Sequence, residues 1–154
     1  MGAPSVGWGD WHDGSAHNGD HRFDWAIAGD PTAVPMRRLV TACNQLRWDH
    51  RALRSETLSV VHVDALNQVI AFKRYHAGEV LLTVLHFGHE NFTGHGYGVA
   101  TGGQNGQWSQ RLCSQDAEFG GWEGAGNAYH EPWTTDGRIF INLPRLSALV
   151  FVLK

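Results

Sequence analysis

The sequence has few of the features that mark export, membrane insertion or nucleic-acid binding. Its first residues contain no basic segment followed by an apolar run, so we expect no signal peptide. No apolar stretch approaches the roughly 20 residues that a membrane-spanning helix needs. The net charge of -3 and the pI of about 6.3 give no excess of positive charge that would attract a nucleic acid or an anionic membrane. We therefore expect neither a nucleic-acid partner nor a membrane partner.

The sequence is equally poor in the patterns of metal sites and nucleophilic enzymes. Its two cysteines, Cys43 and Cys113, have no second cysteine or spaced histidine nearby that would predict a zinc site. Ser55 and Ser114 lie outside any G-x-S-x-G context. We therefore expect reduced thiols in a cytoplasmic protein that holds neither a metal nor a cofactor.

What the sequence does contain is glycine and tryptophan, with 19 and 7 copies in 154 residues. A chain of this length can bury an independent core, because folding removes about 68–70% of its unfolded surface from water. Glycine at this frequency indicates many turns and hence short β-strands. Tryptophan suits stacking on sugar faces, but it also suits an ordinary core. The composition therefore predicts a globular, β-rich protein and leaves the role of the tryptophans open.

Residues 1–32 have no helical or strand period and are rich in glycine, aromatic residues and histidine. So long a lead is unusual in an autonomous domain and is more typical of an active-site loop of a larger body. A metal-binding β-protein would require His12, His17 and His21 to converge, but their spacing matches no zinc pattern. A hydrogen-bonded polar loop is the better interpretation.

The period changes from Ala33 onward and predicts one amphipathic helix that ends near Trp48. Apolar residues recur at intervals of three and four along one expected helix face. That face contains Met36, Leu39, Val40, Cys43 and Leu46. Pro35 is acceptable in the first helical turn, and Asp30 or Thr32 can cap it.

From Glu56 onward short segments with β-type patterns are separated by turn residues. These segments predict seven strands: Thr57–Val63, Gln68–Arg74, Glu79–Phe87, Tyr97–Thr101, Gln107–Cys113, Arg138–Leu143 and Ala148–Leu153. Ile139 and Ile141, for example, alternate with Phe140 and Asn142. The pattern predicts a mainly β fold, an antiparallel β-sandwich of about seven to eight strands preceded by a loop and one amphipathic helix.

The stretch Leu112–Trp133 is too long and too rich in glycine and aromatic residues for a plain hairpin connection. Loops of this kind are either functional or held by a neighbouring surface. We expect a packed structural loop, with Trp25, Trp122 and Trp133 packed against a core or a second domain. For Trp8 and Trp11, stacking on sugar and packing remain equally good interpretations.

Runs of residues along nearly the whole chain follow one family pattern in a fixed order. The first runs are D-H-R-F-D-W at Asp20–Trp25, M-R-R-L-V-T-A-C-N-Q-L-R-W at Met36–Trp48 and A-L-R-S at Ala52–Ser55. Then come N-Q-V-I-A-F-K-R-Y at Asn67–Tyr75, V-L-L-T-V-L-H-F at Val80–Phe87, C-S-Q-D-A-E-F-G-G-W-E-G-A-G-N from Cys113 and R-I-F-I-N-L-P-R-L-S-A-L-V-F at Arg138–Phe151. Together they resemble the end of the catalytic barrel and the all-β C-terminal domain of 1,4-α-glucan (glycogen) branching enzymes.

The resemblance implies a chain in two parts. Residues 1–55 correspond to a remnant of an α-amylase-like catalytic barrel, comprising its last βα loop and final helix, and residues 56–154 to the C-terminal all-β sandwich domain. Enzymes of this family transfer an α-1,4-glucan segment to a 6-hydroxyl with retention of configuration. None of their catalytic Asp, Glu and Asp motifs occurs in this sequence. We therefore expect no catalytic residue here, and a chain that is structural or contacts glucan.

The resemblance also implies partners and candidate binding residues. In the intact enzyme the first loop lines the rim of the glucan cleft, which makes Trp8, Trp11, His12 and Asp13 candidate substrate-binding residues. The apolar helix face from Met36 to Leu46 is expected to cover a missing catalytic barrel. Without that barrel, it must pack on its own sandwich or self-associate. The alternative interpretation is a stand-alone carbohydrate-binding β-sandwich module.

Overall fold

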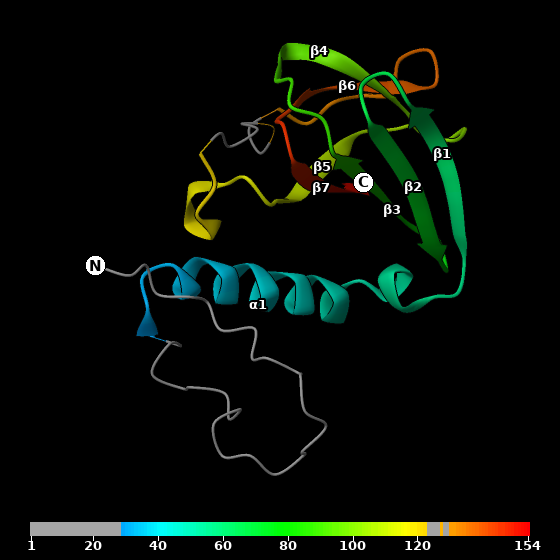
Figure 1. The fold of residues 1–154 in the computed structure, drawn as a ribbon. Helices are drawn as coiled ribbons and strands as arrows, with labels where there is room; N and C mark the ends of the chain where they lie inside the picture. The colour runs from blue at the N-terminus through cyan, green and yellow to red at the C-terminus, as the bar shows by residue number, and fades with distance from the viewer. Residues whose placement is uncertain (1–28, 123–126, 128–129) are drawn as a thin grey trace, which may run out of the picture.

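The computed structural model describes residues 29–122, 127 and 130–154 (Figure 1). Within them, helix α1 (Ala33–Asp49) and the short 3₁₀ helix η3 (Arg51–Arg54) precede the sheets. The strands are β1 (Leu58–Asp64), β2 (Val69–His76), β3 (Glu79–His86), β4 (Phe92–Ala100), β5 (Trp108–Cys113), β6 (Arg138–Leu143) and β7 (Ser147–Leu153). A second 3₁₀ helix, η4 (Ala117–Phe119), lies between β5 and β6.

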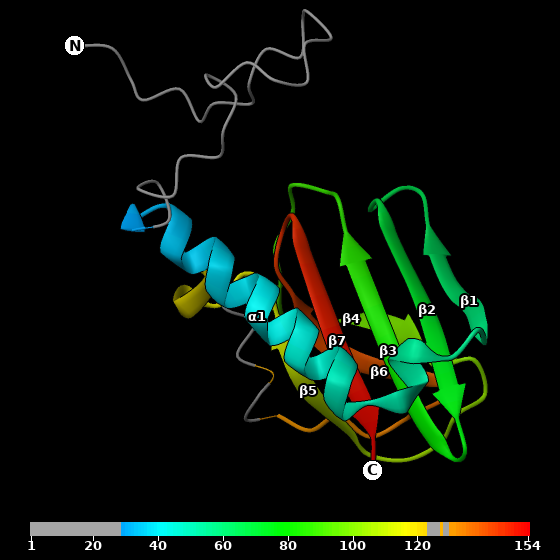
Figure 2. The same cartoon turned by 90° about the horizontal axis from the view of Figure 1, so that it is seen from below.

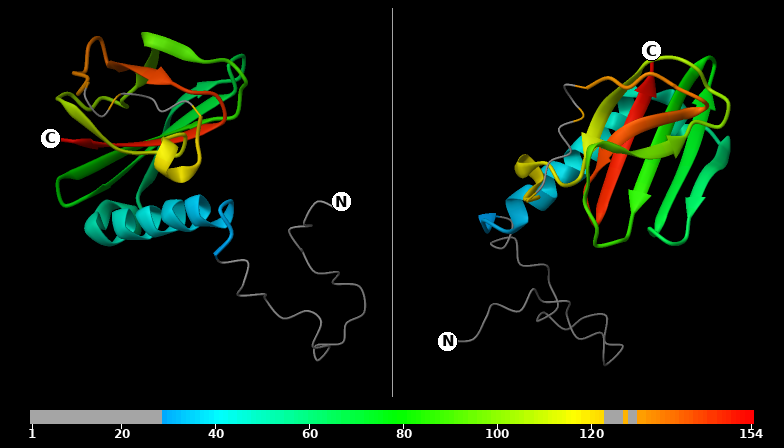
Figure 3. Two further views of the ribbon diagram at one scale, coloured as in Figure 1. Left: turned by 90° about the vertical axis from the view of Figure 1, so that its left-hand side faces the viewer. Right: turned by 90° about the horizontal axis from the view of Figure 1, so that it is seen from above.

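The strands form two antiparallel sheets stacked face to face (Figures 1 and 3). Sheet A has five strands in the order β1-β2-β3-β7-β5, and sheet B contains β4 and β6. Every strand pairing in the two sheets is antiparallel. The mainly β prediction is therefore confirmed, as is the single helix before the strands.

The main core fills the space between the two sheets, because alternate side chains of each strand point into it. On β6, Ile139 and Ile141 are fully buried, whereas Phe140 between them is 44% exposed. Trp108 is also fully buried, and its indole N–H donates to the Thr134 hydroxyl oxygen at 3.0 Å. The inner faces of both sheets therefore close on each other as the alternation predicts.

Helix α1 lies on the opposite, outer face of sheet A (Figure 1). Its half-buried Leu39, Ala42 and Leu46 pack against a second apolar cluster that includes Leu81 and Val150 of the sheet. Leu81 is 1% exposed, although it belongs to the outer face. The helix therefore gives this part of sheet A a second layer.

The C-terminal end of α1 is tied to the sheet by the carboxylate of Glu79. One Glu79 oxygen lies 2.7 Å from His50 Nδ1, and the other accepts the Ala52 N–H at 2.9 Å. Burial opposes ionisation of Glu79, but these two hydrogen bonds outweigh it and lower its pKa. The Arg74 guanidinium also donates to the Leu53 carbonyl oxygen at 2.7 Å. These contacts fix where the helix leaves the sheet.

The long loop after β5 turns back at a glycine pair. Gly120 has a φ of +80°, and a Cβ on Gly121 would lie 2.0 Å from the Gln115 carbonyl oxygen. Because a Cβ cannot approach a carbonyl so closely, this turn requires glycine. A Cβ on Gly120 would lie 3.1 Å from Pro35 Cβ, and Phe119 packs with the α1 cluster. This part of the loop is therefore packed against the helix, as expected.

Of the two expected alternatives for Trp122 and Trp133, packing on the core of this chain is wrong, because their side chains are 79% and 64% exposed, and packing on a second domain stays a prediction. Trp133 follows buried Pro132 in an extended segment that bridges Gln107, so alternation turns its ring outward. Trp122 comes directly after the glycine turn, beyond the contact with α1. The tryptophan Trp25 lies outside the described residues.

Candidate functional site

The sequence-predicted site residues Trp8, Trp11, His12 and Asp13 lie outside the described residues. So do the histidines of the metal hypothesis, His12, His17 and His21. In the described part of the chain, no three His, Cys, Asp or Glu side chains are grouped to hold a metal ion. No helix in that part is long and apolar enough to cross a membrane. The candidate site is therefore a surface.

That surface begins on the outer face of sheet A, where strand register aligns two rows of side chains. The rows are Leu58, Arg74, Leu81 and Val152, and Val60, Phe72, Thr83 and Val150. Directly paired residues project to the same face of a sheet. Leu58 and Val60 on β1 therefore share a face with Leu81 and Val150, which contact α1. Yet Leu58 is 51% exposed and Val60 is 53% exposed.

The surface continues on one flank of α1. Met36, Val40 and Cys43 follow one another at helical spacing and are exposed, Met36 by 60% and Val40 by 51%. The opposite flank of the helix faces β5, so this flank is turned toward β2 and β1, which α1 leaves uncovered (Figure 2). We call Met36, Val40, Cys43, Leu58 and Val60 the open face.

The predicted single helix face therefore divides into two. Leu39 and Leu46 pack on the sheet, whereas Met36, Val40 and Cys43 remain exposed. The sequence pattern joined the two groups because they are adjacent stripes on one helix, separated by less than about a quarter of a turn. The prediction that the helix packs on its own sandwich is confirmed only for the first stripe.

The strand that forms the edge of the open face is held by a polar network behind it. Tyr97 Oη donates to Asp64 Oδ2 at 2.9 Å and lies 3.0 Å from His62 Nε2. Because the phenol proton goes to Asp64, His62 donates its Nε2–H to the phenol oxygen. Asn67 donates its side-chain N–H to Asp64 Oδ2 at 2.7 Å. The network joins β1 on sheet A to β4 on sheet B.

The pKa shifts of Asp64, Tyr97 and His62 show which members of this network are charged. Hydrogen bonds from the Asn67 side chain and backbone lower the pKa of Asp64 to about 2. Burial, followed by the hydrogen bond to Asp64, raises the pKa of Tyr97. Burial, followed by the positive charge of Arg138, lowers the pKa of His62. The network therefore holds an ionised aspartate against a neutral phenol and stiffens the β1 edge.

A groove lies on the other flank of α1, between the helix, β5 and η4. It has a volume of about 1150 Å³ and is open to solvent. Arg38 and Thr41 come from the helix, Arg111 and Leu112 from β5, and Phe119 from η4. Two surfaces of different character therefore flank one helix, an apolar open face and a groove that has charged side chains along an apolar floor.

Residues 60–154 match the family described as alpha amylase, C-terminal all-beta domain. The chain belongs to this family. The match spans β1 from Val60 to the last strand, so both sheets lie inside it. No curated protein matches the chain.

Solved structures with the same fold are α-amylases and a related transferase. The chain is similar to an Anoxybacillus α-amylase, with 17% identity over 75% of this chain and a TM-score of 0.53. It is similar to the α-amylase of H. orenii, with 14% identity over 79% and a TM-score of 0.51. It also resembles CldA, a cyclomaltodextrin glucanotransferase, with 18% identity over 86% and a TM-score of 0.51.

The matched region is a small part of each of those proteins. The chain covers 22% of the Anoxybacillus enzyme, 20% of the H. orenii enzyme and 24% of CldA. Each of them therefore carries most of its length outside the region shared with this chain.

Sequence reasoning missed the part of the open face on β1. Leu58 and Val60 were predicted only as strand residues. The signal was present in L-S-V-V-H-V, where apolar residues occur on both faces of the strand. An edge strand with one face in water normally alternates apolar and polar residues. Apolar residues on both faces indicate a strand that another layer covers.

Proposed function

We propose that this chain is the C-terminal portion of a 1,4-α-glucan branching enzyme and that its open face packs against the catalytic barrel. Residues 1–55 then supply the last loop and helix of that barrel, and residues 56–154 form the β domain. The chain by itself is structural and does not catalyse glucan transfer. In the cytoplasm, where we place it, Trp8, Trp11, His12 and Asp13 contact the glucan from the rim of the cleft.

The observation that supports this proposal is the incomplete cover of sheet A. Its outer face carries exposed Leu58 and Val60 at the β1 edge, but α1 packs only on the part formed by β3, β7 and β5 (Figure 2). Exposed apolar side chains that gather on one side of a protein, unlike those scattered singly, mark interaction sites. Membership of the α-amylase C-terminal family supports a catalytic domain as the covering layer, because the similar enzymes are about four to five times longer than the shared region.

The test is reconstitution with a separately produced branching-enzyme barrel that lacks its own last βα loop, final helix and C-terminal domain. We expect a one-to-one complex by light scattering, and amylose branching by iodine staining only when both parts are present. Val40→Asp and Val60→Asp should each abolish the complex, because each places a charge in an apolar contact.

Phe140→Asp is the matched control, since Phe140 is a similarly exposed apolar residue on sheet B, on the far side of the molecule from α1. It should leave the complex intact. Complex formation that is unaffected by both valine variants would contradict docking through the open face. Branching by the purified chain alone would contradict the non-catalytic assignment.

A further inference from the structure

The groove between α1, β5 and η4 lies on the flank of the helix that the open face does not use. On α1 its lining runs from Val34 to Asp49, so the groove follows the helix for roughly 22 Å. Its floor is apolar, with Leu46 and Leu112 between the helix and the strand. A long, open channel of this shape suits an extended ligand better than a compact one.

The walls of the groove are charged but carry no excess of either sign. Three guanidinium groups and three carboxyl groups line it: Arg37, Arg38, Arg111, Asp49, Asp116 and Glu118. Among the described residues no direct ion pair involves any of these six groups, although Asp49 accepts a hydrogen bond from the Gln45 side chain at 2.8 Å. The groove therefore offers separate donors and acceptors along its length.

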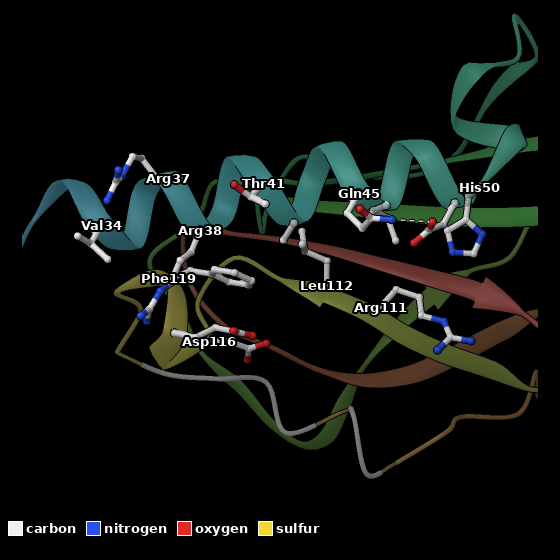
Figure 4. A pocket seen from close by; sticks show the side chains of 14 residues that line it. Val34, Arg37, Arg38, Thr41, Gln45, His50, Arg111, Leu112, Asp116 and Phe119 are labelled. Atoms are coloured by element: carbon white, nitrogen blue, oxygen red, sulfur yellow. Dashed lines mark hydrogen bonds between the residues drawn. The ribbon is translucent and has the colours of Figure 1, made fainter. Parts of the chain in front are cut away.

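Near the first turns of α1, the charged groups and an aromatic ring face one another. Arg38 on the helix is directed toward Asp116 and Phe119 below it (Figure 4). Burial, followed by the negative charge of Glu118, raises the pKa of Asp116. A hydrogen bond from a neutral donor would stabilise the carboxylate of Asp116, which burial and the charge of Glu118 destabilise.

This arrangement selects a class of ligand. An anion would meet the three carboxyl groups, and a cation would meet the three guanidinium groups. A neutral polyhydroxylated chain is repelled by neither set of charges, because each of its hydroxyls can accept a hydrogen bond from an arginine and donate one to a carboxylate. The apolar floor and the aromatic ring suit the C–H faces of a sugar.

We propose that this groove binds a neutral oligosaccharide chain, specifically an α-1,4-glucan, at a site separate from the N-terminal loop. The choice of an α-glucan rests on the proposed function, whereas the neutral, hydroxyl-rich character of the ligand rests on the groove. The site would hold a glucan strand on the β domain, with Arg38, Asp116 and Glu118 as its polar contacts and Phe119 beside the sugar rings.

The experiment is a titration of the full chain with maltoheptaose, followed by amide NMR and by calorimetry. We expect shifts concentrated in α1, β5 and η4. Arg38→Ala and Glu118→Gln should each weaken binding about tenfold, as expected for central polar contacts. Arg51→Ala is the matched control, because Arg51 is an exposed arginine in η3 that does not line the groove. Thermal unfolding of each variant shows whether it remains folded.

Two further probes test the ligand class. Binding of maltoheptaose should change little between low and high salt, and inorganic phosphate should not compete, because the ligand is neutral. Cellohexaose, which has β-1,4 links, should bind at least about tenfold more weakly if the groove follows the curvature of an α-glucan. Competition by phosphate, or equal loss of affinity in Arg51→Ala, would overturn the proposal.

Failure here is distinguishable from failure of the proposed function. The groove variants should leave the complex with the barrel intact, and the open-face variants should leave sugar binding intact. No maltoheptaose binding by a folded chain that still assembles with the barrel would reject the groove site alone.

Discussion

The two faces of sheet A are built from the same strands but reach very different degrees of burial. On the inner face, Leu82, Val84 and Phe151 are fully buried beneath sheet B. On the outer face, burial declines from 1% exposure at Leu81 beside α1 to 53% at Val60 on the edge. The inner face is covered by sheet B, whereas α1 covers the outer face only in part among the described residues.

The largest expected loss of stability comes from a substitution in the core beneath the inner face of sheet A. Trp108→Ala removes a fully buried indole and its hydrogen bond to Thr134, and should lower the free energy of unfolding by about 3–5 kcal/mol. Urea unfolding measures it. Trp48→Ala is the matched control, because Trp48 is 73% exposed and should change stability by less than about 0.5 kcal/mol. Similar losses in both variants would show that the inner face does not dominate stability.

A smaller effect is expected where α1 is tied to the outer face. Glu79→Gln weakens the contacts with His50 and Ala52, and should lower the free energy of unfolding by about 1–2 kcal/mol. We expect faster proteolysis within Arg51–Arg54, because η3 loses its support on the sheet. Glu90→Gln, at an exposed loop position, serves as the control. Unchanged cleavage in Glu79→Gln would mean that the apolar contacts alone hold the helix.

Acid should weaken the link between the two sheets before it affects their core. The pKa of Asp64 is lowered from 3.8 to about 2, so the ionised carboxylate stabilises the folded state above pH 3.8. That stabilisation is lost as the pH falls from 3.8 toward about 2. Urea midpoints measured across this range should decline in the native chain. In Asp64→Asn the decline should be shallower, starting from a lower stability at neutral pH.

The smallest effect on stability should come from the open face itself. Val40→Ala removes exposed atoms and should change the free energy of unfolding by less than about 0.5 kcal/mol. Leu39→Ala, one residue away but directed at the sheet, should cost about 1–3 kcal/mol. Urea unfolding of this pair measures how sharply the helix separates its two stripes. Equal losses would show that both stripes are packed.

Much of the fold could be predicted because local chemistry and tertiary packing agree. Strand β6 has the predicted bounds, Arg138–Leu143, since Ile139 and Ile141 alternate with outward-facing residues. Strand β4 begins five residues before the predicted Tyr97, because its register shifts between Phe92 and Tyr97. A bulge breaks the alternation on which the sequence prediction depends.

The candidate surfaces were harder to predict because they join distant parts of the chain. The groove brings residues near Arg38 beside residues near Asp116, and no periodicity connects the two segments. The exposure of Trp122 could not be predicted because residue type alone does not say on which side of a turn a ring will lie. Gly121 sets that side through its close approach to Gln115.

The position of β7 in sheet A has a consequence for how the protein is made. This strand lies between β3 and β5 and pairs with both. Thr83 and its partner Val150 are separated by 67 residues in the sequence. During synthesis, the inner edge of β3 is therefore exposed until Ser147–Leu153 has left the ribosome, and exposed edges invite wrong pairing. Chains that lack Ser147–Leu153 lose the middle of the sheet, not its margin, so folding of this domain depends strongly on that strand.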